Sequence, residues 1–260
     1  MVVFFEKLGV SSVKSLSGLQ QSFMFTLNLL KTLIRPSTYT IASVQVLVRQ
    51  VYFTAIQILP FYLFLAFIVG ATVIGVIMTF AVGFGFQDKI GTFIVNILIN
   101  ELAPFITVLL LALRSGTAMT TEMAVMNVSG EMNSLRLFGI DPVQYLFVPR
   151  VLNGILSMFL LSTMFTFVAL ISGYLFLALI LNMGLSLYIH GIVEAFGATD
   201  LIVLLLKSLL FGYVVSAIAV YRGNKTLMMY NAVPIAVLQG MVKLFVAILF
   251  IEVLSFLRFM

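Results

Sequence analysis

The chain has 260 residues, of which 62% are hydrophobic and only 9% are charged, and its mean hydropathy is +1.21. A soluble domain carries about 25% charged residues, so this composition excludes a soluble globular protein and predicts an all-α integral membrane protein. The absence of cysteine excludes a disulfide framework and a thiolate metal site. The single histidine cannot form a metal cluster alone. The net charge of +5 is interpreted as a matter of membrane topology, because basic residues collect on the cytoplasmic side of membrane proteins.

The first element predicted along the chain is an amphipathic helix in an N-terminal region of residues 1–50. Arg35-Pro36 provides its stop, and it is not a convincing signal peptide. Two compatible interpretations remain open: an interfacial helix with Lys31 and Arg35 at the cytoplasmic headgroups, or a short helix packed on the bundle. Its apolar residues recur at helical spacing, namely Leu19, Phe23, Leu27, Leu30 and Ile34.

Residues 51–260 are predicted to form a transmembrane domain. A spanning helix needs about 20 mostly apolar residues. An N-terminus in the cytoplasm and a C-terminus outside leave only Lys89 and Arg258 on the outer side, with Lys207 and Lys243 within spans. An odd number of spans cannot divide into two equal inverted repeats, so a transport path would require a symmetric dimer. Five stretches qualify as spans, at about 54–82, 92–113, 147–181, 201–221 and 235–257.

The polar residues concentrate between Asn100 and Arg150, where four of the nine acidic residues lie. Glu101 is inside the second predicted span, and Pro104 removes the helical partner of the Asn100 carbonyl. Such a polar patch is interpreted either as part of a substrate cavity or dimer interface, or as a hydrogen-bonded clamp between helices. The substrate-contacting residues under the first interpretation are Asn100, Glu101, Leu102 and Pro104.

A cytoplasmic helix is predicted between the second and third spans, from about Thr121 to Gly139. Gly139 can close it in a left-handed conformation, and Asp141-Pro142 then resembles the start of the next helix. Because the chain lacks a phosphate-binding glycine loop, this helix is interpreted as a lever for a soluble partner, although it could merely cap the bundle. The residues predicted to couple it to the partner are Glu122, Val128, Glu131, Met132, Leu135 and Asp141.

At this segment the sequence resembles the MlaE-type permeases, membrane subunits of ABC transporters that carry lipids between the inner and outer membranes of Gram-negative bacteria. Weaker similarities occur at Leu47-Val48-Arg49-Gln50 and from Phe196 to Gly212. The similarity extends over residues from about 47 to 225. The matching motif positions are Glu101-Leu102-Ala103-Pro104, Arg114, Gly116, Ala118, Glu122, Glu131, Asp141-Pro142 and Pro149-Arg150.

This resemblance implies a non-catalytic permease homodimer in the inner membrane that contributes to outer-membrane lipid asymmetry. It implies two separate cytoplasmic ATPase subunits that bind ATP and Mg²⁺, sometimes a STAS-domain subunit, and a periplasmic hexamer of MCE proteins. The expected cargo is a phospholipid, or in some relatives a sterol or another hydrophobic compound. The chain itself is expected to hold no cofactor and no catalytic residue.

Two positions depart from the family pattern. Asn100 stands where many relatives have an arginine, so its amide can form hydrogen bonds but cannot neutralise a lipid phosphate. The loop from Arg222 to Gly240 lacks the usual glycine-rich sequence with a Thr-Arg pair. The alternatives to a lipid permease are a secondary transporter or channel with Glu101 as an ion or proton site, a non-transporting scaffold, and an intramembrane enzyme using Glu101, Asp200 or His190.

Overall fold

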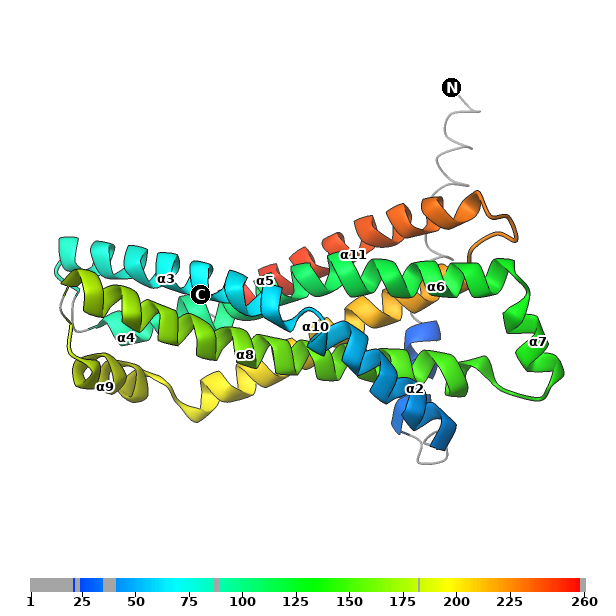
Figure 1. Cartoon of the computed structure of the whole chain (residues 1–260), viewed down its shortest axis with the longest axis horizontal. Coiled ribbons are helices and arrows are strands. Elements are labelled where there is room, and N and C mark those ends of the chain that lie inside the picture. The colour runs from blue at the N-terminus through cyan, green and yellow to red at the C-terminus, as the bar shows by residue number, and fades with distance from the viewer. Residues whose placement is uncertain (1–20, 22–23, 35–40, 87–88, 182, 258–260) are drawn as a thin grey trace, which may run out of the picture.

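The structure is a computed structural model that describes residue 21 and residues 24–34, 41–86, 89–181 and 183–257. All regular elements within these ranges are helices, as the sequence predicts, and they form an elongated bundle (Figure 1). Among the described residues, five helices are long and apolar enough to cross a membrane, and each overlaps one predicted span. These helices are Val44–Gly83, Ile90–Val128, Val143–Ile180, Ala198–Asn224 and Ala232–Phe256.

The first span begins earlier than the predicted residue 54. Helix α2 (Ile41–Val51) continues through the π-helical turn η2 (Tyr52–Ile56), and α3 (Leu59–Gly83) follows with Pro60 in its first turn. The polar residues of α2, such as Arg49 and Gln50, interrupt the apolar run, so the hydropathy pattern alone placed the start too late.

The N-terminal helix at Met24–Ile34 packs on the bundle. Leu29 is only 1% exposed within a cluster that contains Met123 and Phe147. The Tyr213 hydroxyl donates a hydrogen bond of 2.7 Å to the Thr26 carbonyl. These contacts support the packed interpretation, while Leu19, Phe23 and Arg35 lie outside the described residues.

The second span continues directly into the predicted cytoplasmic helix, which corrects the separate helix expected at 121–139. The helical run consists of α4 (Ile90–Phe93), η4 (Ile94–Leu102), α5 (Ala103–Leu111), η5 (Ala112–Gly116) and α6 (Thr117–Val128).

A second short helix, α7 (Glu131–Leu137), follows α6 after a break at Gly130, whose φ is +81°. Helices α6 and α7 together form an arm at one end of the bundle. A left-handed residue cannot continue an α-helix, so one expected helix becomes two. Gly139 has φ +74°, and the Asp141 carboxylate accepts a hydrogen bond of 3.0 Å from the Val143 N–H. Both turn predictions after the arm are therefore confirmed.

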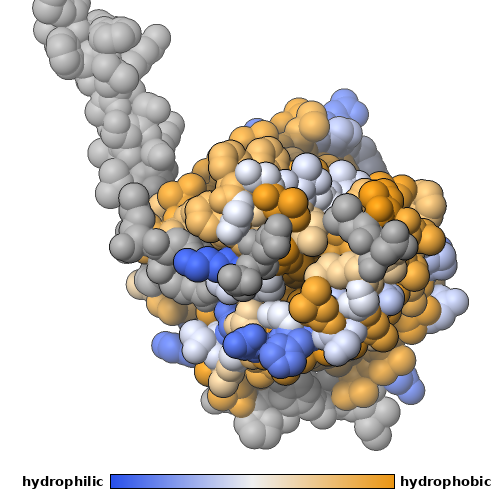
Figure 2. Space-filling model, turned by 90° about the vertical axis from the view of Figure 1, so that its left-hand side faces the viewer, coloured by the Kyte–Doolittle hydropathy of each residue, from blue (hydrophilic) through white to orange (hydrophobic). Residues whose placement is uncertain are grey.

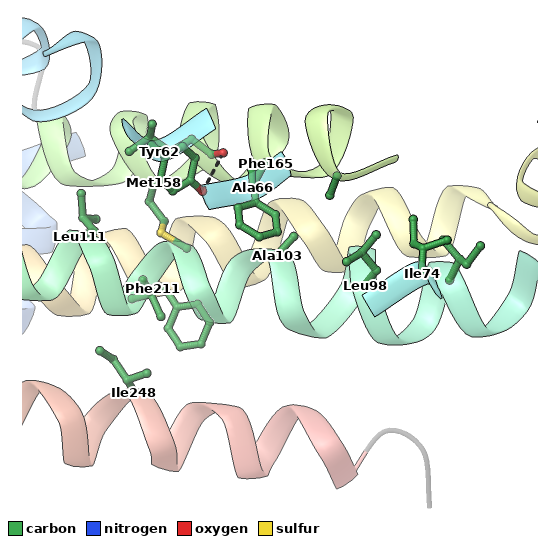
Figure 3. Packing of buried hydrophobic residues seen from close by; sticks show 14 of the residues in the cluster. Tyr62, Ala66, Ile74, Leu98, Ala103, Leu111, Met158, Phe165, Phe211 and Ile248 are labelled. Carbon is green, nitrogen blue, oxygen red and sulfur yellow. Dashed lines mark hydrogen bonds between the residues drawn. The ribbon is translucent and has the colours of Figure 1, made fainter. Parts of the chain in front are cut away.

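The third span is the centre of the bundle. It comprises η6 (Val143–Phe147) and the long α8 (Val148–Leu181), which packs against α3 and against α10 (Ala198–Asn224). Helix α11 (Ala232–Phe256) packs against α10 and α6 and leaves a broad apolar face exposed. Figure 3 shows part of the main core, where the rings of Tyr62 of α3 and Phe165 of α8 lie 5.8 Å apart and Phe211 of α10 belongs to the same cluster.

Helix α9 (Leu185–Ala195) lies at the end of the bundle opposite α7 (Figure 1). It crosses α4 at a point where the two backbones touch, because a β-carbon added to Gly91 would lie 1.8 Å from the Gly191 carbonyl oxygen. The Tyr188 hydroxyl donates a hydrogen bond of 2.9 Å to the Leu170 carbonyl. Burial raises the pKa of Tyr188, so this hydroxyl keeps its proton at physiological pH.

Candidate functional site

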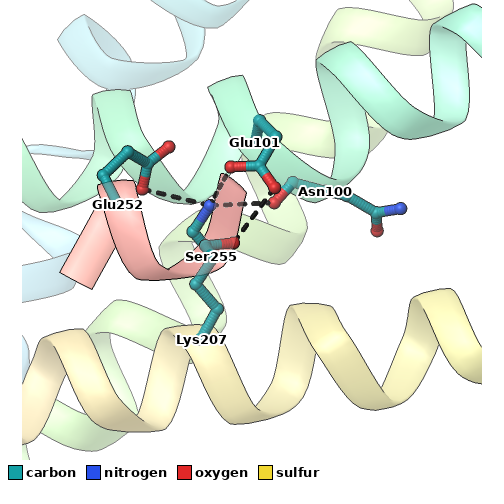
Figure 4. A network of polar contacts seen from close by, with 5 residues as sticks. All are labelled: Asn100, Glu101, Lys207, Glu252 and Ser255. Carbon is teal, nitrogen blue, oxygen red and sulfur yellow. Dashed lines mark hydrogen bonds and ion pairs between the residues drawn. The ribbon is translucent and has the colours of Figure 1, made fainter. Parts of the chain in front are cut away.

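Lys207 on α10 forms ion pairs with two carboxylates in the interior of the bundle (Figure 4). Its ammonium donates a hydrogen bond to Glu101 of η4 and lies 3.0 Å from a carboxylate oxygen of Glu252 on α11. The Lys207 side chain is 5% exposed, and those of Glu101 and Glu252 are 8% and 14% exposed. A charge buried in this way is stable only when it is paired, so the three residues form one electrostatic unit.

The local backbone explains why Lys207 has a further acceptor. Pro104 has no N–H to offer the carbonyl of Asn100, and the π-helical η4 directly precedes it. The freed Asn100 carbonyl accepts a hydrogen bond of 3.3 Å from the Lys207 ammonium. The Ser255 hydroxyl adds a hydrogen bond of 3.1 Å to Glu101. The structure thus gives the Asn100 carbonyl, which Pro104 cannot serve as a helical donor, a partner from the fourth span.

The side chain of Asn100 points away from this ammonium (Figure 4). Asn100 is fully buried, and its Nδ2 donates a hydrogen bond of 2.7 Å to Asp200 at the start of α10. Its Oδ1 is buried without a hydrogen-bond partner among the described residues.

The four predicted substrate-contacting residues therefore lie mainly inside the bundle. Asn100, Glu101 and Pro104 are buried, and Leu102 is half-buried. The bonds of Asn100 and Glu101 join the second span to the fourth and fifth, which supports the interpretation as a clamp between helices. Their contact with a substrate stays a prediction. The sequence did not pair Asn100 with Asp200, although two polar groups in an apolar bundle would each require a partner.

An open apolar groove of about 480 Å³ lies between α3 and the α4–η4 segment. Among its lining residues, only Thr72 is polar. Figure 2 views the nearby end of the bundle, where hydrophobic residues cover much of the surface. Sequence analysis missed this groove because every span is apolar on several faces. The aromatic residues that line it are Phe80, Phe84, Phe86 and Phe93.

The predicted coupling residues all lie on the arm or beside its base, but not all of them are accessible. Glu131 and Asp141 are exposed, Val128 and Leu135 are half-buried, and Met132 is only 2% exposed because it packs in the cluster under the N-terminal helix.

Glu122 has a partner that was not predicted. Its carboxylate lies 3.0 Å from the guanidinium of Arg150, whose side chain is only 7% exposed. This ion pair ties α6 to the first turn of α8, so the arm is fixed to the third span.

The tip of the arm carries two large apolar residues that the sequence analysis did not select. Leu137 is 87% exposed and Phe138 is 80% exposed. They end α7, which lies at the end of the molecule farthest from α9 (Figure 1). They fall outside the regular apolar spacing of the arm, and their position directly before Gly139 was the available signal. Large apolar side chains exposed side by side are typical of a protein interface.

Several polar motif residues meet where the first, second and third spans come together. Arg114 donates hydrogen bonds of 3.1 Å to the Phe53 carbonyl and 2.9 Å to the Gln57 side chain. Arg114, Gln57 and Glu122 contribute to the lining of a small polar cavity of about 260 Å³. Arg114 therefore holds the base of the arm against η2.

Together, the five long apolar helices define a multi-pass membrane protein. The sequence model of the family described as Permease MlaE matches residues 47–257. The chain therefore belongs to the MlaE permease family, and it is the permease subunit of an ABC transporter.

Similar curated proteins agree with this assignment. A Rickettsia typhi protein named "Probable ABC transporter permease protein" is 27% identical over 216 residues, which are 83% of this chain and 82% of the relative. The Haemophilus influenzae "Intermembrane phospholipid transport system permease protein MlaE" is 30% identical over 50% of this chain and 49% of its own length. The chloroplastic protein Trigalactosyldiacylglycerol 1 of Arabidopsis thaliana is 30% identical over 55% of this chain and 41% of its own length.

Proposed function

We propose that this chain moves phospholipids between the inner and outer membranes of a Gram-negative-type cell, as a homodimer in the inner membrane. The open apolar groove between α3 and η4 is the observation that carries the proposal. Acyl chains are favoured by such a surface, and a second copy of the chain would close the groove into a cavity. The similarity to an intermembrane phospholipid transport permease supplies the cargo.

The arm provides the connection to the energy source. In the proposed topology the N-terminus and α7 are cytoplasmic, because this arrangement keeps most of the basic residues inside. Leu137 and Phe138 then present an apolar tip to a separate ATPase, and the exposed Glu131 lies at the start of the same helix. Movement of the tip would be transmitted to the third span through the Glu122–Arg150 ion pair. The STAS-domain subunit and the MCE hexamer implied by the family resemblance complete the proposed complex.

The transport proposal can be tested by filling the groove. Val76 lines it and is 50% exposed, so Val76→Trp would occupy space without disturbing the core. We expect ATP-driven transfer of a fluorescent phospholipid by the complete complex in proteoliposomes to fall at least several-fold, with the complex still assembled. Leu160 on α8 is 45% exposed and does not line the groove, so Leu160→Trp is the matched control and should transport normally. Unchanged transfer by Val76→Trp would contradict the groove as the lipid path.

The coupling proposal has a separate test. Leu137→Ser with Phe138→Ser, and independently Glu131→Lys, should release the ATPase during purification while the membrane fold stays intact. Leu227→Ser with Met228→Ser removes apolar residues that are 70% and 66% exposed on the loop between α10 and α11, and it serves as the control. Full retention of the ATPase and of lipid-stimulated ATP hydrolysis by both arm variants would exclude this docking surface.

A further inference from the structure

Arg222 and Lys243 are two cations beside the contact between α10 and α11, and no acidic residue in the described part of the chain pairs with either. Arg222 lies in the last turn of α10, and its Nε is buried without a hydrogen-bond acceptor. Lys243 is exposed on α11 and lies one turn after Gly240, the residue of α11 that packs against Arg222. The helices meet closely here, because a β-carbon on Gly240 would lie 3.7 Å from the Arg222 β-carbon.

The acidic residues that the structure describes are all engaged elsewhere. Glu101 and Glu252 pair with Lys207, Glu122 pairs with Arg150, and Glu194 lies 3.6 Å from His190. Asp200 accepts the bond from Asn100, and the two remaining carboxylates, Glu131 and Asp141, bond within the arm and its turn. Within the described part of the chain, no carboxylate therefore pairs with Arg222 or Lys243.

The depth of this cation pair is set by its contacts with the second span. Leu244 lies 3.0 Å from the β-carbon position of Gly116, and Thr120 lies 3.6 Å from that of Gly240. Gly116 and Thr120 follow shortly after Arg114 in the second span. The helix Ile90–Val128 has 39 residues, or roughly 58 Å, whereas a bilayer core is about 30 Å thick. The residues after Arg114 thus lie near the headgroups on the side of α7.

We propose that Arg222 and Lys243 bind the phosphate of an anionic phospholipid in the leaflet on the side of α7. A guanidinium and an ammonium on neighbouring helices are suited to a phosphate ester, and basic pockets between membrane helices bind anionic headgroups. Exposed apolar residues of α11 after Lys243, including Val246 and Phe250, continue toward the membrane interior, where the acyl chains would lie. The site is separate from the groove on α3 and depends only on the membrane topology, so its failure would leave the proposed transport function standing.

The test measures which lipid the protein retains. The purified complex is placed in nanodiscs of phosphatidylcholine that contain a minor fraction of phosphatidylglycerol, and the bound lipid is identified by native mass spectrometry. We expect enrichment of phosphatidylglycerol, and a roughly fivefold loss of enrichment for Lys243→Gln or Arg222→Gln. Lys243→Arg keeps the positive charge and should keep the enrichment of phosphatidylglycerol. Arg49→Gln removes one exposed cation from α2 and is the matched control for total charge.

Each alternative gives a different result. Equal loss in Arg49→Gln would indicate general attraction to the basic surface and would overturn the site. Displacement of the lipid by added inorganic phosphate would assign the pair to a free phosphate instead. Retained enrichment in the double variant Arg222→Gln/Lys243→Gln, or none in the unaltered protein, would also refute the proposal.

Discussion

Asn100 and Asp200 are 100 residues apart in the sequence, yet the Asn100 amide donates a hydrogen bond of 2.7 Å to the Asp200 carboxylate. This bond joins the middle of the second span to the first turn of the fourth. It also gives the asparagine a structural role inside the bundle.

Replacement of Asn100 by leucine should destabilise the bundle by about 1–3 kcal/mol, because a buried polar contact of Asp200 is lost. Chemical denaturation in detergent would measure the change. Asn96→Leu is the control, since Asn96 is half-buried one turn earlier on the same segment. A loss of stability no greater than that of the control would mean that the Asn100–Asp200 bond contributes little.

Removal of the buried cation should have a larger effect. Lys207→Met leaves Glu101 and Glu252 facing each other without a counter-ion, and we expect a loss of about 3–5 kcal/mol. The combined variant Lys207→Met/Glu101→Gln/Glu252→Gln should recover part of that loss in the same unfolding assay. Lys89→Met removes an exposed cation just before α4, and as the control it should be close to neutral. If the triple variant were no more stable than Lys207→Met, charge pairing would not explain the effect.

The close contact between α8 and α10 can be tested by a glycine-to-alanine change at the contact, compared with one on α3 that lies away from it. A β-carbon on Gly212 would lie 2.6 Å from the Gly154 carbonyl oxygen, so Gly212→Ala should cost about 1–3 kcal/mol through overpacking. Gly83 has nothing within 4 Å of its β-carbon position, and Gly83→Ala should be neutral or slightly stabilising. Thermal unfolding of the two variants side by side gives the comparison, and equal midpoints would contradict the tight crossing.

The break between α6 and α7 should depend on Gly130. Its φ of +81° is unfavourable for alanine, so Gly130→Ala should cost about 1 kcal/mol and loosen the arm. Hydrogen exchange of the arm would increase relative to the unaltered protein. Gly184, with φ −70° and open space around it, gives the control Gly184→Ala, which should leave exchange unchanged. Identical exchange in both variants would show that the left-handed turn does not limit the arm's motion.

Local sequence rules predicted much of this architecture, because many of its features depend only on residues close together in the chain. Twenty apolar residues in a row define a span, proline at 104 frees a specific carbonyl, and glycine at 139 allows a left-handed turn. The same rules failed at Gly130, where one apolar spacing continued across a residue that adopts φ +81°. They also gave no reason to choose Leu137 and Phe138, since exposure depends on what packs nearby.

By itself, the sequence determined the all-helical membrane class, the number and order of the spans, and the polar residues that would require partners. It did so because burial in lipid demands long apolar helices and penalises every unpaired charge. Only the tertiary structure decided the partners: Lys207 for Glu101, Asp200 for Asn100, and Arg150 for Glu122. Those pairs join different spans, and their geometry depends on how whole helices pack, which no local pattern encodes.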